Sequence, residues 1–423
     1  MAERSPKRFW RRFKQSRIAI ISLIVCSFWI VMAIIGPFVV SPLPYSCELR
    51  GETIYPLWNP NRVDSLVDPI QPKLYSEIRW DTVQLENVSW ALIPYGTKGL
   101  SAHKEMKPFK PQLPAGAVQE LQGRFRHHLG TNREGRDILA ILILGSRNAL
   151  LFALIAVGIV AMLGILIGSA MGYIGDSGLA QSRGVVLGAL LGIIPAWFYG
   201  FQVRAFAIED AIGFAVVGEF LLSLMIALGI LVAFTYLGHK LTRWAWWRKS
   251  LPIPLDLLLL KAIELIESLP LIMLVISLGA IFGKNVWFFM LCLGLINWTG
   301  VARLVRGEML RVRNLDYIQA AQALGLKPRQ IIWQHALPNA LPAVIVVLVT
   351  SLGGAVLIES SLSFLGLVNE SASWGGLLTN AREEGFENWW VIVLPGLAIF
   401  SLVISINLVG ERLRDVWDPK TTE

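Results

Sequence analysis

The sequence is poor in charge. Only 16% of its 423 residues are Asp, Glu, Lys or Arg, whereas 54% are hydrophobic. An average soluble domain carries about 25% charged residues. Several apolar runs approach or exceed the roughly 20 residues that cross a bilayer as a helix. The composition therefore excludes an ordinary soluble protein and predicts an all-α polytopic membrane protein.

The common motifs of catalysis and nucleotide binding are missing. The Gly283-Lys284 pair is followed by Asn285, so it is not a phosphate-binding loop, and neither a His-Glu-x-x-His zinc helix nor a Gly-x-Ser-x-Gly elbow is present. The five histidines have no ligand spacing, and the adjacent rings of His127 and His128 point apart. We expect no intrinsic enzyme, no metal site and no directly bound cofactor. A transporter of this kind needs an ion gradient or an ATPase partner.

Cysteine is scarce, with three residues in the chain. Cys26 and Cys292 fall in apolar runs and are predicted to be core residues. Cys47 lies alone outside these runs and is expected to be exposed. A single external cysteine has no internal partner, so no disulfide framework is predicted.

The apolar runs predict eight spans. The first, 18–40, follows a basic segment, 1–17, that is expected to stay in the cytoplasm, and it is read as an uncleaved span. The other spans are expected at 147–173, 184–201, 213–237, 256–282, 286–304, 341–362 and 391–410. This parity puts both termini, including the tail 412–423, in the cytoplasm. The pair 184–201 and 213–237 fits either a membrane hairpin or a re-entrant pair. The net charge of +8 is then a topology signal, and no nucleic-acid binding is expected.

A polar segment, 41–140, lies between the first two spans and is predicted to be periplasmic. Prolines scattered from Pro42 to Pro114 predict irregular structure without a large core. Near its end, Thr131 and Glu134 have the spacing of a capping box, so a helix is expected to begin there.

A second polar stretch, 313–338, predicts two short helices joined by a turn. Asp316 is a good N-cap for the first helix, and Gly325 stands where a left-handed ending is needed. Pro328 suits the first turn of the second helix, and Pro338 and Pro342 mark the return to the membrane. We call residues 313–338 the hook.

The first helix of the hook is slender and marginal in isolation. Ala320, Ala321 and Ala323 keep it narrow, and Ile318 with Leu324 forms an apolar stripe suited to a groove on another protein. An amphipathic connector lying on the membrane surface fits the same periodicity equally well.

The hook resembles the EAA loop of bacterial ABC importer permeases. The matching positions are Gln319-Ala320-Ala321, Gly325 and His335-Ala336-Leu337-Pro338. Gln319 replaces an acidic residue of the pattern and His335 replaces isoleucine. The resemblance implies that the hook docks an ATPase through Asp316, Tyr317, Gln319, Ala320, Ala321, Leu324, Gly325, Leu337 and Pro338.

Other segments are similar to the dipeptide/oligopeptide/nickel permease family, closest to its oligopeptide/microcin C branch. They are 128–137, 359–366, 373–375 and 407–419. The resemblance covers roughly 15–40, 127–175 and 256–419. It implies the type I ABC importer transmembrane fold, with six common spans, a permease domain at 147–411 and a two-span insertion at about 178–255.

The resemblance also implies a function. The chain would be half of an inner-membrane permease pair, completed by a second homologous permease, two ABC ATPase subunits that use ATP, and a periplasmic binding protein. Peptides are the default substrates of this family. The alternatives are the same machinery for nickel, a metal chelate or a sugar, and a gradient-driven carrier or scaffold without ATPase partners.

Polar residues inside spans are costly and often functional. Glu267, Asn297, Glu359 and Asn407 are candidates for the translocation path. For the last three, interhelical hydrogen bonding is the alternative. Lys261 and Glu264 have the spacing of a local ion pair, and Trp298 is expected to be a packing residue.

Overall fold

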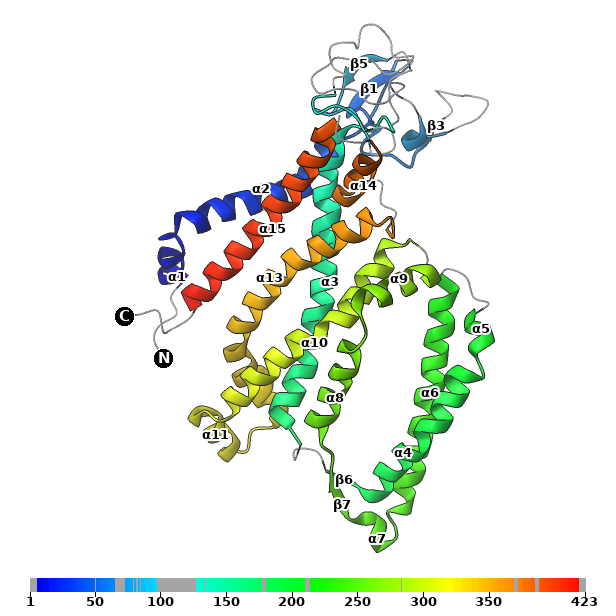
Figure 1. The fold of residues 1–423 in the computed structure, drawn as a ribbon, viewed down its shortest axis with the longest axis vertical. Helices are drawn as coiled ribbons and strands as arrows, with labels where there is room; N and C mark the ends of the chain where they lie inside the picture. Colours follow the sequence, from blue (N-terminus) through cyan, green and yellow to red (C-terminus); the bar gives the residue numbers. More distant parts are fainter. Residues whose placement is uncertain are drawn as a thin grey trace. The chain divides into compact units, whose positions relative to one another are not determined.

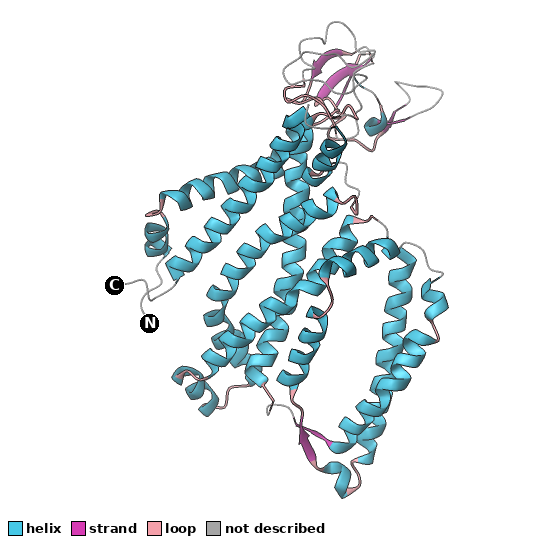
Figure 2. Cartoon of the chain, viewed as in Figure 1, coloured by secondary structure: helices cyan, strands magenta, loops and turns pink. Residues whose placement is uncertain are grey.

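The structure is a computed structural model of the chain. The residues that it describes are 6–49, 51–64, 73–78, 80, 83, 85–96, 127–132, 134–176, 180–209, 214–282, 284–368, 372–384 and 388–417. Residues 97–126 of the predicted periplasmic segment and residues 418–423 of the predicted tail lie outside them. Helices dominate the described residues, whose strands form short sheets (Figure 2).

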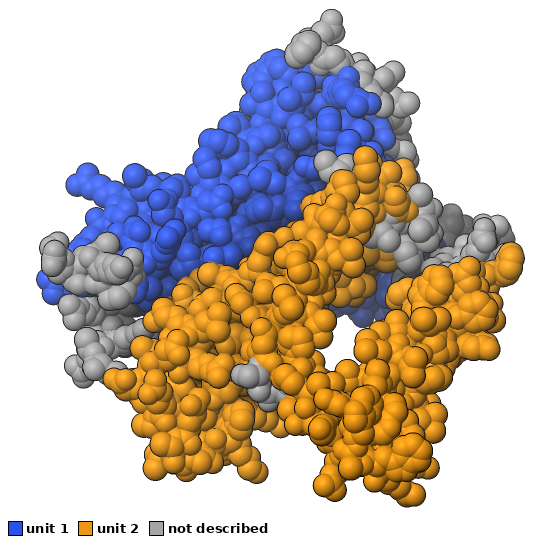
Figure 3. Space-filling model, turned by 60° about the horizontal axis from the view of Figure 1, so that its bottom comes forward, with its two compact units in different colours: residues 1–157, 346–423 blue, residues 158–345 orange. Residues whose placement is uncertain are grey.

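The chain divides into two compact units (Figure 3). Unit 1 consists of residues 1–157 and 346–423, and unit 2 consists of residues 158–345. The division falls inside two long helices, α3 (Ile138–Ile174) and α13 (Leu337–Phe364), which therefore contribute to both units (Figure 1). The hook belongs wholly to unit 2.

Unit 1 is organised around one buried tryptophan. Its other helices are α1 (Pro6–Phe13), α2 (Arg17–Val39), α14 (Trp374–Glu384) and α15 (Trp389–Trp417). The indole N–H of Trp374 donates to the carbonyl of Leu142 on α3 at 2.9 Å, and its ring meets that of Trp29 on α2 edge to face, with centroids 5.0 Å apart. Trp29 donates in turn to Ser401 on α15 at 3.0 Å. This aromatic pair ties α2, α3, α14 and α15 together.

The outer segment of unit 1 contains strands that its prolines did not predict. β1 (Ser46–Leu49) pairs antiparallel with β2 (Glu52–Ile54) and with β5 (Glu86–Ser89). β3 (Val63–Asp64) pairs with β4 (Lys73–Leu74), which leads into the 3-10 turn η1 (Tyr75–Glu77). The small core beneath them consists of Leu43, Cys47, Leu49, Ile54, Tyr75, Trp80 and Trp90. Among the described residues of this segment, this small core is the cluster beneath the strands.

Cys47 corrects the prediction of an exposed cysteine. Its side chain is fully buried in the small core, and burial raises the pKa of its thiol to about 11. Strand β1 turns this residue inward because alternate side chains of a strand point to opposite faces. Cys292 is buried, as predicted for a core residue, whereas Cys26 is half-buried.

Unit 2 contains the remaining helices. They are α4 (Arg183–Trp197), α5 (Ala205–Glu209), α6 (Phe214–Leu241), α7 (Ala245–Arg248), α8 (Leu255–Glu267), α9 (Leu271–Phe282), α10 (Val286–Arg313), α11 (Asp316–Ala323) and α12 (Pro328–Gln330), with π-helical turns η4 (Phe198–Gln202) and η5 (Ile331–Ala336). α4 and α6 form an antiparallel hairpin closed at one end by β6 (Ala180–Ser182) and β7 (Ser250–Pro252) (Figure 1).

Seven of the eight predicted spans correspond to a helix long and apolar enough to cross a membrane. The helices of the α4–α6 hairpin are among them, which favours a membrane hairpin over a re-entrant pair. The predicted span 256–282 is instead divided into α8 and α9. Pro270 separates them because proline lacks an amide hydrogen and disfavours a helical residue before it.

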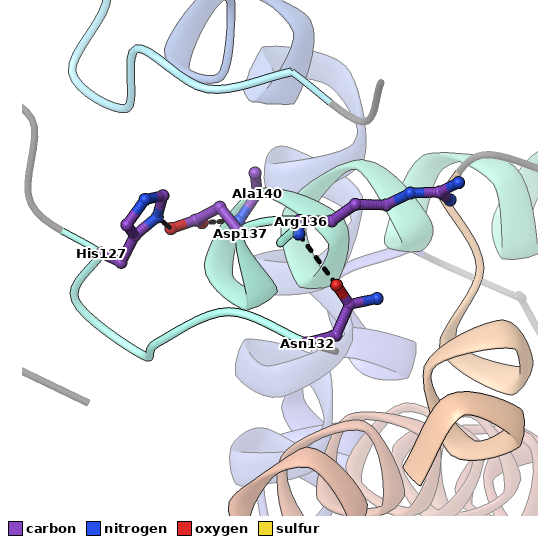
Figure 4. Close-up of polar contacts among 5 residues, drawn as sticks. All are labelled: His127, Asn132, Arg136, Asp137 and Ala140. Atoms are coloured by element: carbon purple, nitrogen blue, oxygen red, sulfur yellow. Dashed lines mark hydrogen bonds and ion pairs between the residues drawn. The ribbon is translucent and has the colours of Figure 1, made fainter. Parts of the chain in front are cut away.

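The start of α3 also differs from its prediction. The spacing of Thr131 and Glu134 predicts that they cap this helix, but the helix begins at Ile138. Asp137 is the capping residue, because its Oδ1 accepts from the amide of Ala140 at 2.7 Å (Figure 4). Thr131 forms an isolated antiparallel bridge with Asp137, so the segment makes a turn before the helix.

That turn is held by buried polar contacts. The Nδ1 atom of His127 lies 2.8 Å from Oδ2 of Asp137, and both side chains are almost fully buried (Figure 4). The imidazole also stacks on the ring of Tyr95 at 4.0 Å between centroids. Asn132 accepts from the amide of Arg136 at 2.8 Å. These contacts fix the N-terminal end of α3 against the segment that contains the strands β1 to β5.

Candidate functional site

The hook folds as the helix-turn-helix that its sequence predicts. α11 is followed by Gly325 in the left-handed conformation, with φ of +78°. The amide of Gly325 donates to the carbonyl of Gln322 at 2.9 Å, and the amide of Leu326 donates to that of Ala321 at 3.2 Å. These two bonds make a Schellman ending, which favours glycine because a Cβ is strained at this φ.

The beginning of α11 corrects one residue of the prediction. Leu315, rather than Asp316, is the N-cap, and its side chain makes no capping bond. The carbonyl of Leu315 accepts from the amides of Ile318 at 2.9 Å and Gln319 at 3.2 Å, which places Asp316 inside the first turn. Its carboxylate still lies near the positive end of the helix dipole.

α11 has an inner and an outer face. Ile318 and Ala321 are buried within this chain, whereas Leu324 is 82% exposed. The predicted stripe of Ile318 and Leu324 is therefore wrong, because these two side chains lie on different faces. The outer face consists of Asp316, Gln319, Ala320, Ala323 and Leu324. Tyr317 is half-buried between the faces, and burial raises the pKa of its hydroxyl.

The second helix of the hook continues into the membrane. Pro328 begins it, as predicted, and α12, η5 and α13 form one helix over residues 328–364. In η5 the helix widens, and the amide of Leu337 donates to the carbonyl of Ile332. This wider turn precedes Pro338, which has no amide hydrogen for a normal helical bond. Leu337 is buried and Pro338 is exposed.

The hook is joined firmly to the spans of unit 2. α11 packs on η5 and on the end of α10. α10 in turn lies very close to α3, where a Cβ at Gly168 would lie 2.8 Å from Cβ of Val305 and would overlap the carbonyl oxygen of Ala302. Only glycine permits this approach. Gln322 of α11 also donates to the hydroxyl of Tyr173 on α3 at 3.3 Å.

A polar face lies on α8 and α10. We define it by Lys261, Glu264, Glu267, Asn297 and Arg303. Lys261 pairs with Glu264 at 2.7 Å, as predicted, and Glu267 pairs with Arg303 across the two helices. The four charged side chains are between 34% and 65% exposed. Charges facing acyl chains are unfavourable by several kcal/mol, about 3 or more at the bilayer centre. This face therefore suits water or protein better than lipid.

Trp298 and Asn297 of α10 differ in how well they match their predictions. Trp298 packs in a buried cluster with Met171, Ile263 and Ala302, which confirms its packing role. The side-chain Nδ2 of Asn297 donates to the backbone carbonyl of Leu293 one turn earlier at 2.9 Å, and the residue remains exposed. Asn297 therefore makes an intrahelical bond instead of the interhelical bond considered for it.

The structure contains an ion pair that no sequence pattern predicted. Arg306 donates from Nε and Nη2 to the two carboxylate oxygens of Asp256, at 2.5 Å each, and Asp256 is only 8% exposed. Asp176, just after α3, accepts from the amide of Leu257 at 3.1 Å and so caps α8. The two residues are fifty positions apart in the sequence. Only the presence of charges at the ends of apolar runs could therefore have indicated that they pair.

Glu359 is buried in unit 1. Its Oε1 accepts from the hydroxyls of Ser363 and Ser373 at 3.0 Å each, and its Oε2 accepts from Ser360 at 3.2 Å. Ser373 immediately precedes α14, so the carboxyl group joins α13 to the start of α14. This arrangement matches the hydrogen-bonding alternative. Asn407 is exposed on α15 and lies beside α13, where a Cβ at Gly353 would come within 3.0 Å of its Oδ1.

Two protein families match the chain. Residues 225–423 match the binding-protein-dependent transport system inner membrane component, and residues 7–59 match the N-terminal TM domain of oligopeptide transport permease C. Together these two matches include more than half of the chain. The first contains α8, α10, the hook, α13 and α15, and the second contains α2.

Individual relatives agree with these families. The chain is 36% identical over 167 residues to the oligopeptide transport system permease protein OppC of Haemophilus influenzae, covering 39% of this chain and 54% of that protein. It is 34% identical over 167 residues to the probable D,D-dipeptide transport system permease protein DdpC of Escherichia coli, covering 39% and 56%. The OppC protein of Salmonella typhimurium is 32% identical over 168 residues, covering 39% and 56%.

These alignments span little more than half the length of each relative. They nevertheless agree with the two family matches, with the long apolar helices and with the EAA-like spacing of the hook. Over residues 225–423 the chain is therefore similar to the binding-protein-dependent transport system inner membrane components, and its long apolar helices agree with a multi-pass inner-membrane protein of the type I ABC importer membrane fold.

Proposed function

We propose that this chain is a permease subunit of an ATP-driven importer and forms half of a membrane path for peptides. The observation that carries the proposal is the hook. Its inner face is buried on α10 and η5, whereas its outer face, with Ala320 and Leu324, has no cover among the described residues. A helix held rigidly from one side and open on the other suits docking of a partner protein.

The proposed assembly has several partners. A second, homologous permease completes the path, and two ABC ATPase subunits bind the hooks from the cytoplasm. A periplasmic binding protein delivers the substrate, and both termini of this chain are cytoplasmic. ATP is used by the ATPase subunits, and this chain carries no catalytic site or cofactor of its own. The close approach of Gly168 to α10 supports transmission of ATPase movement from the hook into the spans.

We infer that the polar face of α8 and α10 is a wall of the path. The exposed Glu267–Arg303 pair and the exposed Asn297 support this inference, because water or polar substrate stabilises such groups. The satisfied hydrogen bonds of Glu359 support a structural role for that residue. Asn407, exposed on α15, remains a candidate for the path in unit 1.

Peptides are proposed as substrates because the relatives are named as oligopeptide and dipeptide permeases. A nickel complex or another solute is the alternative for the same machinery. The test is calorimetric titration of the partner periplasmic binding protein with peptides, nickel chelates and sugars. Binding of nickel chelates or sugars alone would reject the peptide assignment and leave the docking proposal standing.

The docking proposal is tested by co-purification with the two ATPase subunits. Deletion of residues 316–326 or the substitution Gly325→Pro is expected to abolish co-purification. The sharper variant is Ala320→Trp, which adds bulk to the outer face without disturbing the buried one. Its matched control is Ala245→Trp, since Ala245 is also an exposed helical alanine of unit 2. We expect at least a tenfold loss of ATPase binding for the first substitution and no loss for the second.

A gradient-driven carrier makes the opposite prediction. In proteoliposomes, such a carrier would move substrate without ATPase subunits and would tolerate Ala320→Trp. Equal transport with and without the ATPase subunits would therefore reject the importer assignment. Loss of ATP-dependent uptake in the Ala320→Trp variant, with normal folding in detergent, is the result expected for the importer.

A further inference from the structure

The α4–α6 hairpin ends in a dense group of cations. Arg183 begins α4, Lys240 lies in the last turn of α6, and Arg243, Arg248 and Lys249 lie in or beside α7. We call these five residues the basic clasp; they belong to the end of the hairpin where β6, β7 and α7 lie (Figure 1). Residues 221–255 contain no aspartate or glutamate. None of the five cations pairs with a carboxylate in the described part of the chain.

The clasp is a folded element rather than a loose loop. β6 and β7 pair antiparallel over three residues each, and the amide of Arg183 donates to the carbonyl of Lys249 at 2.9 Å. The guanidinium of Arg183 also lies over the ring of Trp246, 5.0 Å from its centroid. These contacts place Arg183, at the start of α4, beside Lys249, which follows α6 and α7 in the sequence. Unpaired cations that a folded backbone places close together attract phosphate groups through charge-assisted hydrogen bonds.

We call the exposed apolar surface of α6 next to the clasp the apolar strip. Val232, Tyr236, Leu237 and Leu241 are exposed on this helix, and Lys240 lies 5.0 Å from the ring centroid of Tyr236. Trp244 and Trp246 are exposed at the end of the strip. Tryptophans and basic residues in this order are typical of the boundary between headgroups and acyl chains. A soluble phosphate would use the cations and leave the apolar strip without a partner.

We propose that the basic clasp binds the phosphate groups of anionic phospholipids, whose acyl chains lie along the apolar strip of α6. The bound lipids would hold the end of the inserted hairpin at the membrane surface. The orientation rule for basic loops requires only that the charges remain on one side of the membrane. A folded clasp with its own aromatic residues goes beyond that requirement and predicts measurable selectivity for anionic lipid.

The test is native mass spectrometry of the full chain in detergent, titrated with phosphatidylglycerol or with zwitterionic phosphatidylcholine. We expect tighter binding of phosphatidylglycerol. For the double variant Arg243→Gln/Arg248→Gln, the Kd for phosphatidylglycerol should rise on the order of thirty-fold, as expected for the loss of two cations near an anionic headgroup. Arg243→Lys/Arg248→Lys keeps both charges and should stay within a few-fold of the wild type.

The matched control is Lys327→Gln/Arg329→Gln, which removes the same charge from exposed positions in the hook. It should leave phosphatidylglycerol binding unchanged. An equal loss in the control would overturn the proposal, because net charge alone would then explain binding. Equal affinity for the two lipids, unchanged binding in the glutamine variant, or displacement of lipid by equimolar inorganic phosphate would also overturn it. None of these measurements depends on transport, so they stand apart from the importer test.

Discussion

Two glutamates of this chain lie in predicted spans and have opposite surroundings. Glu359 is buried and accepts hydrogen bonds from three serine hydroxyls. Glu267 is 34% exposed and pairs with Arg303 of a neighbouring helix. The first is satisfied entirely inside its own chain, whereas the second remains open to whatever covers the polar face. An acid in a span therefore indicates function only when its environment leaves room for a partner.

The Asp256–Arg306 pair lies between these extremes. Asp256 is 8% exposed, and Arg306 binds it with two nitrogens, yet its guanidinium reaches the surface. The three acids thus form a series in burial. If this comparison is right, the loss of stability on removing the acid should decrease from Glu359 to Asp256 to Glu267. The loss of transport should not follow this order.

The largest loss of stability is expected for Glu359→Ala. The substitution leaves three hydroxyls without their acceptor and opens a cavity beside α14. At about 0.6 kcal/mol for each hydrogen bond within a membrane, plus the cavity, we expect roughly 2 to 3 kcal/mol. The measurement is the midpoint of thermal unfolding in detergent. Uptake should fall only as far as the amount of folded protein falls.

Glu359→Gln separates structure from transport at this site. Glutamine keeps the volume and one carbonyl acceptor, so stability should drop by about 1 kcal/mol or less. If this variant folds normally but loses uptake, Glu359 has a role in the path and the comparison fails.

A smaller loss is expected for Asp256→Asn. It leaves Arg306 charged beside a neutral partner, which is worth about 1 to 2 kcal/mol at this partial burial, between the values for buried and surface pairs. The double variant Asp256→Leu/Arg306→Leu removes both charges and should recover part of the loss. The same unfolding midpoint reports both variants, and a double variant less stable than the single one would contradict this account.

The fold was largely predictable because helix formation in a membrane depends on local composition. Seven runs were long and apolar enough to identify their helices, and Gly325 and Pro328 correctly marked the turn of the hook. The misses arose where contacts distant in sequence override local signals. Asp137 caps α3 in place of Thr131, and Cys47 is buried by strands that have no clear sequence pattern.

The site was less predictable, because the residues that define it depend on which face of a helix is covered. Periodicity grouped Ile318 with Leu324, but packing of α11 on η5 buries the first and leaves the second exposed. Glu267 was identified by its depth in a span, whereas its partner Arg303 lies on another helix. No spacing rule relates two residues that meet only through the packing of α8 on α10.

For Glu267→Gln we expect little loss of stability and a clear loss of transport. A partly exposed ion pair contributes about 0.5 kcal/mol or less. If the polar face is a wall of the path, an unpaired Arg303 should bind an anionic group of the substrate or the water around it. This binding should lower uptake several-fold. Uptake per folded protein in proteoliposomes measures this. The charge-reversed variant Glu267→Arg/Arg303→Glu should recover part of the activity. If this variant recovers no activity, the result argues against a role of the pair in the path.

The smallest effect is expected for Lys261→Gln. Lys261 and Glu264 are 65% and 59% exposed, so in the isolated chain their pair should change the free energy of unfolding by about 0.3 kcal/mol or less. The informative measurement is the same substitution in the assembled importer. If the second permease covers this part of the polar face, the pair becomes buried and its loss should lower the stability of the complex more than that of the chain alone. If both show the same small change, Lys261 faces water in the assembly as well, and the second permease does not cover this part of the polar face.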